Sequence, residues 1–267
     1  MDSKTLSQER YTQYAQGYVT SKAHAKAAEL PHLVEIARPQ SNWIVLDVAT
    51  GGGHTALAFS PHVAQVVATD LTPKMLEKAE AHITGQGVTN VEFKLADAEE
   101  MPFEDGTFDL VTCRIAPHHF VDCAKFVQES ARVLRGPEPA KGKPGGLLLV
   151  QDHVLPDDEK AARAVDAFER LRDPSHNRAF DESEWQRMFE GARLTVEHSE
   201  QIVKRHAFIP WAERQGCTPE VVAQLTAMMQ QAPAAARDWM QPQEWSTPAA
   251  TFANHHIIIA GRKAQAR

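Results

Sequence analysis

The sequence predicts an α/β fold built on a doubly wound, seven-stranded, mostly parallel sheet, with the last strand antiparallel and a helical cap. Three observations lead to this prediction. Strand-like apolar runs alternate with helical stretches through residues 44–150, and two more strand-like runs follow a helical insertion. A glycine-rich turn comes directly after the first run. Strands that alternate with helices form right-handed β-α-β units, and helices then cover both faces of the sheet.

Five strand-like runs are expected in the first half of the chain, with helices between most of them. The runs are residues 44–46, 66–68, 91–93, 108–111 and 147–150, and the helices are residues 73–83 and 122–134. Residues 136–146 contain three prolines and four glycines. A loop is therefore expected to lead into the fifth strand.

The segments on either side of this core, which spans residues 41–154, are mainly helical in pattern. Residues 1–40 are expected to form a helical lid of two helices that ends at Pro39. Residues 155–193 are expected to form a cap insertion with helices at 159–171 and 182–189. Residues 194–267 should complete the sheet with strands at 194–203 and 256–261, and about 208–245 should add a second cap segment with a helix at 220–229.

Composition limits the class of protein. The 267 residues are 43% hydrophobic and carry a net charge of -7 without a basic cluster, which indicates a globular protein and argues against nucleic-acid binding. The N-terminus is polar and no run of 18 apolar residues occurs, so neither secretion nor a membrane span is expected. Three cysteines without a C-x-x-C pair favour a reduced, cytoplasmic protein. Composition leaves open whether it is a monomer or a homodimer.

The segment Val45-Leu46-Asp47-Val48-Ala49-Thr50-Gly51-Gly52-Gly53 places a glycine cluster between a buried strand and a helix. Glycines let the backbone approach a ligand and adopt positive φ, as nucleotide-binding turns after a first strand require. Gly51, Gly53 and Ala56 also fit the G-x-G-x-x-A form of the dinucleotide fingerprint. A nicotinamide-dependent oxidoreductase therefore has to be considered.

Three acidic residues lie where the first three strands end. Asp47 precedes the glycine cluster, where a carboxylate would repel a pyrophosphate but attract an ammonium or a sulfonium. Asp70, nineteen residues past Gly51, can accept both hydroxyls of a ribose, and Asp97 with Ala98 can bind an adenine. Each acid alone could instead cap a helix or face water. Together they favour S-adenosylmethionine, which carries both cations and no phosphate.

Four segments carry a family resemblance: the glycine cluster, Asp70-Leu71-Thr72-Pro73-Lys74-Met75-Leu76, Asp97-Ala98-Glu99-Glu100-Met101-Pro102-Phe103 and Phe108-Asp109-Leu110-Val111. Over about residues 40–153 the chain resembles class I S-adenosylmethionine-dependent methyltransferases, within them the UbiE-like or type 11 branch. The resemblance implies a Rossmann-like core that binds this cofactor. The implied cofactor residues are Asp47, Ala49, Gly51, Gly53, Asp70, Leu71, Met75, Asp97, Ala98 and Arg114. Ala49 stands where many members have glycine, a common variant in this branch.

The catalytic group is expected after the fourth strand, in Pro117-His118-His119-Phe120. Methyl transfer needs positioning, exclusion of water and, where the acceptor loses a proton, a general base, for which the pKa of histidine is suited. The UbiE-like pattern commonly has histidine directly before this aromatic residue, so the resemblance favours His119 over His118. Either histidine could instead be structural. A metal would need a third ligand such as Asp122, but adjacent side chains diverge, so no metal site is expected.

The predicted cap contains Arg172-Asp173-Pro174-Ser175-His176, a polar turn between two helices. Arg172 and His176 are expected to face an acidic or carbonyl-bearing acceptor, with a solvated loop as the alternative. In the N-terminal segment, Tyr11, Tyr14 and Tyr18 form either a lid over the cofactor or helix-packing contacts. The role of His24 stays open.

These features predict a methyltransferase that acts on carbon or oxygen of a small molecule. Enzymes that methylate nitrogen in nucleic acids or proteins commonly carry an Asn/Asp-Pro-Pro-Tyr/Phe run, where this chain has Arg114-Ile115-Ala116-Pro117. Two alternatives remain: a nicotinamide-dependent oxidoreductase, which Asp47 disfavours, and a cofactor-binding protein with no catalysis or a different reaction.

Overall fold

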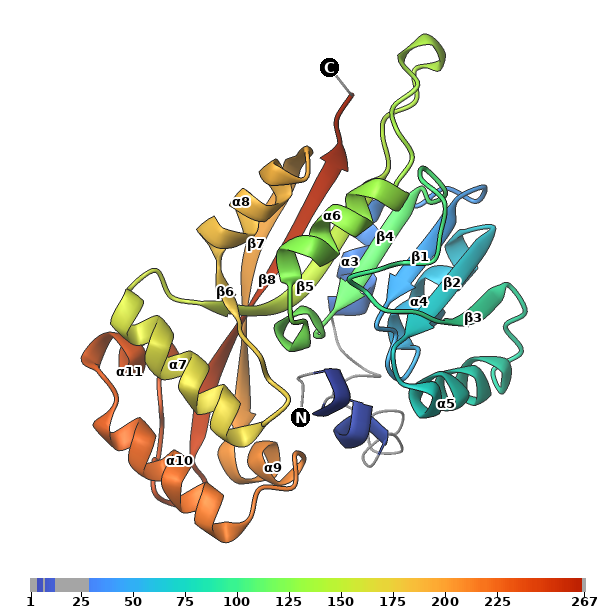
Figure 1. Ribbon diagram of the computed structural model, residues 1–267. Coiled ribbons are helices and arrows are strands. Elements are labelled where there is room, and N and C mark those ends of the chain that lie inside the picture. The colour runs from blue at the N-terminus through green and yellow to red at the C-terminus, as the bar shows by residue number, and fades with distance from the viewer. Residues whose placement is uncertain (1–3, 7, 13–28, 266–267) are drawn as a thin grey trace.

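A computed structural model describes residues 4–6, 8–12 and 29–265 of the chain. Its centre is a sheet with the strand order β3-β2-β1-β4-β5-β8-β7, which confirms the predicted fold class (Figure 1). Five strands pair in parallel: β1 (Ile44–Val48), β2 (Gln65–Asp70), β3 (Val91–Leu95), β4 (Leu110–Arg114) and β5 (Leu147–Leu155). The last strand, β8 (Thr251–Lys263), is antiparallel to both β5 and β7 (Leu194–Ala207). The two-residue β6 (Phe180–Asp181) adds a short parallel pair with β5.

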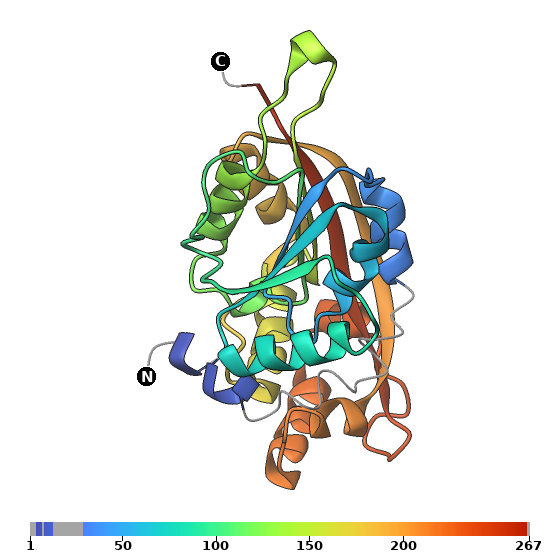
Figure 2. The same cartoon turned by 90° about the vertical axis from the view of Figure 1, so that its right-hand side faces the viewer.

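Helices cover both faces of the sheet (Figure 2). On one face, α3 (Glu29–Ala37), α4 (His54–Phe59) and α5 (Pro73–Thr84) share an apolar core with the strands. On the other face, α6 (Cys123–Val133) and α8 (Glu182–Gly191) contribute to a second core. Because helices bury both sides, β1 and β4 are nearly continuous apolar runs with almost no exposed side chains.

Local sequence signals fix the starts of several helices. Pro73 occupies the first turn of α5, where its missing N–H costs nothing. The side chain of Asp122 caps α6 by accepting from the N–H of Lys125 at 2.9 Å. Asp181 and Glu184 form a reciprocal capping box at the start of α8.

A third apolar core forms the cap, which lies beside the extended ends of β7 and β8 (Figure 1). It contains α7 (Glu159–Arg172), α9 (Phe208–Glu213), α10 (Pro219–Gln231) and α11 (Ala234–Met240). Within it, Phe168 of α7 stacks on Trp211 of α9 with ring centroids 5.5 Å apart. The segment predicted as one cap insertion, residues 155–193, is thus divided, because α7 joins the cap whereas α8 packs on the sheet.

The predicted helices and strands occur at nearly the predicted positions, but β7 and β8 are longer than expected. Their extra residues mix polar and apolar side chains, since one side of the hairpin packs on the cap while the other stays partly exposed. In the N-terminal segment, residues 4–6 and 8–12 are helical. Among the described residues, no helix combines the length and apolar character that crossing a membrane requires.

Candidate active site

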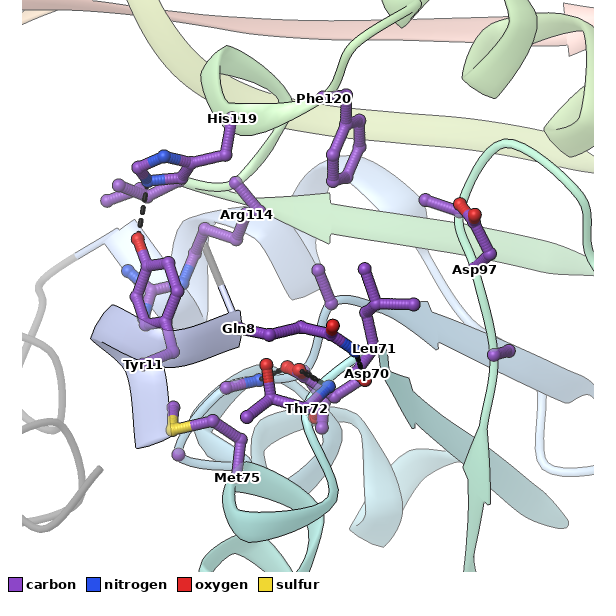
Figure 3. Close-up of a pocket in the computed structure, with 18 of the residues that line it drawn as sticks. Gln8, Tyr11, Asp70, Leu71, Thr72, Met75, Asp97, Arg114, His119 and Phe120 are labelled. Atoms are coloured by element: carbon purple, nitrogen blue, oxygen red, sulfur yellow. Dashed lines mark hydrogen bonds between the residues drawn. The ribbon is translucent and has the colours of Figure 1, made fainter. Parts of the chain in front are cut away.

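A cavity opens at the carboxyl ends of β1 to β4, next to the N-terminal segment (Figure 3). This is the edge of a doubly wound sheet where ligands bind. Eight of the ten residues expected to bind a cofactor line it, together with the expected base His119: Ala49, Gly51, Asp70, Leu71, Met75, Asp97, Ala98 and Arg114. Asp47 and Gly53 are absent from this lining.

The glycine turn owes its shape to left-handed backbone at three positions. Ala49 has φ 52°, Gly51 has φ 57° and Gly53 has φ 79°. A side chain on Gly53 would place its Cβ 2.8 Å from Cδ1 of Ile83 in α5. Gly53 therefore permits close packing of α5 behind the turn, whereas Ala49 and Gly51 form the cavity wall.

Asp47 lies behind the turn and does not line the cavity, contrary to the expectation that it meets the cofactor directly. Its side chain is only 1% exposed. Its carboxylate accepts from the hydroxyls of Thr112 at 2.8 Å and Thr50 at 2.6 Å, and from the N–H of Ala56 at 3.2 Å. Burial raises the pKa of Asp47 to about 6. This carboxylate thus fastens the glycine turn to β4 and to the start of α4.

Asp70 ends β2 and faces the cavity (Figure 3). One oxygen accepts from the N–H of Gly51 at 3.1 Å and the other from the N–H of Thr72 at 2.9 Å. Burial raises the pKa of Asp70, and these hydrogen bonds oppose that shift. A carboxylate can accept about four hydrogen bonds, so Asp70 retains capacity for two hydroxyls of a ligand.

The N-terminal segment closes the acidic side of the cavity. Nζ of Lys4 lies 2.6 Å from Oδ2 of Asp97 and 3.0 Å from Oε2 of Glu99. Burial alone would lower the pKa of Lys4, but its hydrogen bonds to both carboxylates raise it. The side chain of Gln8 donates to the carbonyl oxygen of Leu71 at 2.9 Å. The carboxylates of Asp97 and Glu99 thus bind the ammonium group of Lys4 at this side of the cavity.

His119 lies in the 3-10 turn η2 (Pro117–His119), which follows β4 and lines the cavity. Its Nδ1 lies 2.9 Å from the carbonyl oxygen of Ser175, which can only accept, so Nδ1 carries the proton. Its Nε2 lies 2.5 Å from the hydroxyl of Tyr11, which donates to it (Figure 3). Burial lowers the pKa of His119 and favours the neutral ring. Nearby, Nε of Arg114 donates to the hydroxyl of Thr55 at 3.2 Å.

The other expected catalytic residues, His118, His176 and Arg172, do not line this cavity. His118 pairs with Asp152 at 2.6 Å, and His176 pairs with Asp166 at 2.7 Å. The guanidinium of Arg172 lies over the ring of Trp211, 4.2 Å from its centroid. His176 is only 4% exposed, so the polar turn is a buried support behind η2 and not the solvated loop considered as its alternative.

Sequence reasoning missed Lys4 and Gln8, because their partners are 93 and 63 positions away. No local pattern reports contacts of that separation. Tyr11 was considered a lid residue and does line the cavity. Tyr14, Tyr18 and His24 lie outside the described residues.

Comparisons with known proteins show the family. A family model described as a methyltransferase domain matches residues 46–150. The chain is 36% identical over 228 residues to the uncharacterized methyltransferase YcgJ of Bacillus subtilis, covering 85% of this chain and 87% of YcgJ. It is 34% identical over 139 residues to the ubiquinone/menaquinone biosynthesis C-methyltransferase UbiE of Pseudomonas putida, which is 51% of each chain.

Solved structures support the same relationship. The structure of YcgJ gives a TM-score of 0.83 at 35% identity, covering 89% of this chain and 99% of that one. A solved protein from Bacillus halodurans C-125 gives the same TM-score of 0.83 at 37% identity, covering 90% of this chain and 100% of that one.

The fold and the cavity define a Rossmann-like enzyme with a cavity at the carboxyl edge of the sheet, lined in part by acidic side chains. The chain belongs to the class I S-adenosylmethionine-dependent methyltransferases, in the UbiE-like, type 11 branch. This confirms the family that the sequence motifs predicted.

Proposed function

We propose that this enzyme transfers the methyl group of S-adenosylmethionine to carbon or oxygen of a small molecule, and that His119 accepts the proton that the acceptor loses. The observation that carries the proposal is that His119 lines the same cavity as Asp70 and Asp97, with its Nε2 hydrogen-bonded to Tyr11, another lining residue. The acceptor atom forms a bond to the methyl carbon while the sulfur–methyl bond breaks, and the sulfur keeps the electron pair. The acceptor's proton passes to Nε2.

The residues present fit this cofactor. When bound, it supplies an electrophilic methyl group on a cationic sulfur. Asp70 has acceptor capacity for the hydroxyls of a ribose, and Asp97 with Ala98, where the resemblance implies the adenine, lines the same cavity. Ala49 and Gly51 let the backbone approach the ligand from below.

His119 is suited to the role of base because its two nitrogens differ. Nδ1 donates to the Ser175 carbonyl, which fixes the ring and leaves a lone pair on Nε2. That lone pair already accepts a phenolic hydroxyl, that of Tyr11. This contact supports an acceptor with an acidic hydroxyl, or with a carbon acidified by a neighbouring carbonyl. Phe120 and Ile115 add apolar walls that exclude water from the reacting atoms.

The nicotinamide alternative is disfavoured by charge. Asp70 faces the cavity beside the glycine turn, and its carboxylate would repel a diphosphate placed there. Asp97 and Glu99 contribute less, because Lys4 pairs with both. The other alternative is a protein that binds the cofactor without transferring its methyl group. The experiment below distinguishes it from the proposed methyltransferase.

The test is mass spectrometry of a metabolite extract incubated with the full chain and S-adenosylmethionine that carries a deuterated methyl group. We expect a product heavier by the labelled methyl that forms much more slowly with His119→Gln, while calorimetry shows S-adenosylhomocysteine binding to both proteins. Binding of NADH and not of S-adenosylhomocysteine would overturn the methyltransferase assignment. Binding without any labelled product from broad metabolite pools would favour the non-catalytic alternative.

A further inference from the structure

Behind the cavity lies a buried group of histidines that the proposed reaction does not use. His118 is at the centre, and its ring centroid lies 4.1 Å from that of His119, 4.6 Å from that of His153 and 5.2 Å from that of His176. His256 of β8 extends the group, 4.7 Å from His153. Imidazoles packed so closely in a protein interior are common metal ligands.

Three residues of this group bring potential metal ligands together. One ligand atom each of His118, Asp152 and His153 lies within 4.8 Å of the others. Asp152 and His153 are consecutive in β5, and His118 comes from η2, so the set joins two elements. We propose that His118, Asp152 and His153 bind a divalent first-row transition metal such as Zn²⁺ or Co²⁺.

His118 and Asp152 are hydrogen-bonded to each other in this structure. Such a contact is expected when a proton, and not a metal ion, lies between two potential ligands. Nδ1 of His118 lies 2.6 Å from Oδ1 of Asp152, and ligands of one ion would be only slightly farther apart. The other oxygen of Asp152 accepts from the backbone N–H of His118 at 2.8 Å, which orients the carboxylate. Oε1 of Glu169 lies 3.9 Å from Nδ1 of His153, beyond hydrogen-bond distance, and accepts from the side-chain amide of Asn254 at 2.7 Å.

A second observation points to a missing partner at this place. His256 is 3% exposed and packs against His153, and its Nδ1 has no hydrogen-bond partner among the described residues. A buried polar nitrogen without a partner is costly and calls for an ion, a water or a function. An ion at His153, with its coordinated water, would supply one.

Charge and softness select the class of metal. Asp152 is fully buried, and within the described part of the chain its ion pair is with His118 and not with a lysine or arginine. A neutral imidazole has a lone pair on one ring nitrogen, so His118 and His153 can each supply one ligand atom. Two imidazoles and one carboxylate suit zinc, cobalt, nickel or iron better than magnesium or calcium, which prefer oxygen. The side chain of His153 is 13% exposed, the most accessible of the three.

The nearest candidate that sequence reasoning offered, Asp122, has a different role, since it is exposed and caps α6. The other two ligands, Asp152 and His153, instead come from β5. A metal here would connect η2 to β5 directly behind His119, so its role is to position that turn. It does not touch the acceptor.

The experiment uses the full chain after removal of metals with a chelator, and Co²⁺ as the probe. We expect one equivalent of Co²⁺ to give visible d–d absorption and Zn²⁺ to displace it. Asp152→Asn and His153→Gln should each weaken Co²⁺ binding by more than the roughly 10–100-fold that loss of an outer partner costs. The control His62→Gln removes an exposed imidazole of the 3-10 turn η1 (Ser60–His62), outside the set, and should keep the affinity of the unaltered protein.

Folding is checked by circular dichroism and by S-adenosylhomocysteine binding of each variant. Should the buried variants fail to fold, X-ray absorption of the zinc-loaded unaltered protein decides, with two imidazoles and oxygen ligands expected. Absence of stoichiometric cobalt binding, equal affinity in all variants, or zinc without imidazole ligands would each overturn the proposal. Because metal binding is read without methyl transfer, its failure is distinguishable from failure of the proposed reaction.

Discussion

Tyr11 donates its hydroxyl to Nε2 of His119 at 2.5 Å and so joins the N-terminal segment to the turn after β4. The two rings meet edge to face with centroids 5.2 Å apart. The Tyr11 hydroxyl is hydrogen-bonded to the lone pair of Nε2. We propose that this same lone pair takes the proton that the methylated molecule loses. An acceptor that uses His119 must therefore displace Tyr11 from this nitrogen.

Replacing His119 by glutamine should lower kcat by about 10²–10⁴-fold, the contribution typical of a general base. Cofactor affinity should change little, because His119 lies on the acceptor side, away from Asp70 and Asp97. The measurements are turnover with the acceptor found by labelling and calorimetry with S-adenosylhomocysteine. Unchanged turnover would remove His119 from the mechanism.

Tyr11→Phe is the matched variant on the other side of this hydrogen bond. It removes a contact worth about 1 kcal/mol that the acceptor has to break, so kcat/KM should rise by up to about fivefold. The variant keeps the ring and its packing against His119. A large fall in kcat would instead show that the Tyr11 hydroxyl takes part in moving the proton.

Asp70→Asn should weaken S-adenosylhomocysteine binding by about 10–100-fold, since hydrogen bonds to a charged acceptor are worth about 1.5–3 kcal/mol. The N–H groups of Gly51 and Thr72 each donate to one oxygen of the Asp70 carboxylate. The asparagine side chain has only one oxygen, so one of these two hydrogen bonds is also lost. Calorimetry measures the affinity, and Glu80→Gln, an exposed acid on α5, serves as the charge control. Equal affinities of the two variants would argue against a cofactor contact by Asp70.

Gly53→Ala should destabilise the fold more than Gly87→Ala. Both glycines have positive φ, 79° and 78°, so alanine costs about 1–2 kcal/mol of backbone strain at either position. Only at Gly53 does the new Cβ meet a neighbour, Cδ1 of Ile83 at 2.8 Å, which adds about 1–3 kcal/mol. Urea unfolding measures both losses, and adding Ile83→Val should recover part of the difference. Equal losses at the two glycines would contradict the packing role.

The buried carboxyl group of Asp47 should make the free energy of unfolding depend on pH. Burial raises its folded pKa to about 6 from an ordinary 3.8, so the folded protein holds this proton more tightly than the unfolded chain. The stability that the proton provides is complete below about pH 4 and is lost as the pH rises through about 6. Asp47→Asn lacks this contribution, so the variant should lose about 2 kcal/mol more unfolding free energy at about pH 4.5 than at about pH 7.5. Denaturant titrations of both proteins at the two pH values test this, and a pH-independent difference would contradict it.

The sequence by itself was sufficient for the fold class, because the relevant signals are local. The apolar run ending in Asp47 and the cluster from Gly51 to Gly53 define a buried strand and a tight turn. Parallel strands end on the same side of a sheet, so residues that follow the strands were predicted to lie near one another. Asp70, Asp97 and His119 do line one cavity.

Only the tertiary structure decided which side chains face the cavity. Asp47 turns inward to Thr50 and Thr112 because the hydrogen bonds behind the turn satisfy its buried charge. Lys4 reaches Asp97 across 93 positions, and His118 meets the β5 residue Asp152 and not its sequence neighbour Asp122. The physical reason is the same in each case: periodicity reports which face of an element is buried, but the partner that a polar group finds there depends on contacts between distant segments.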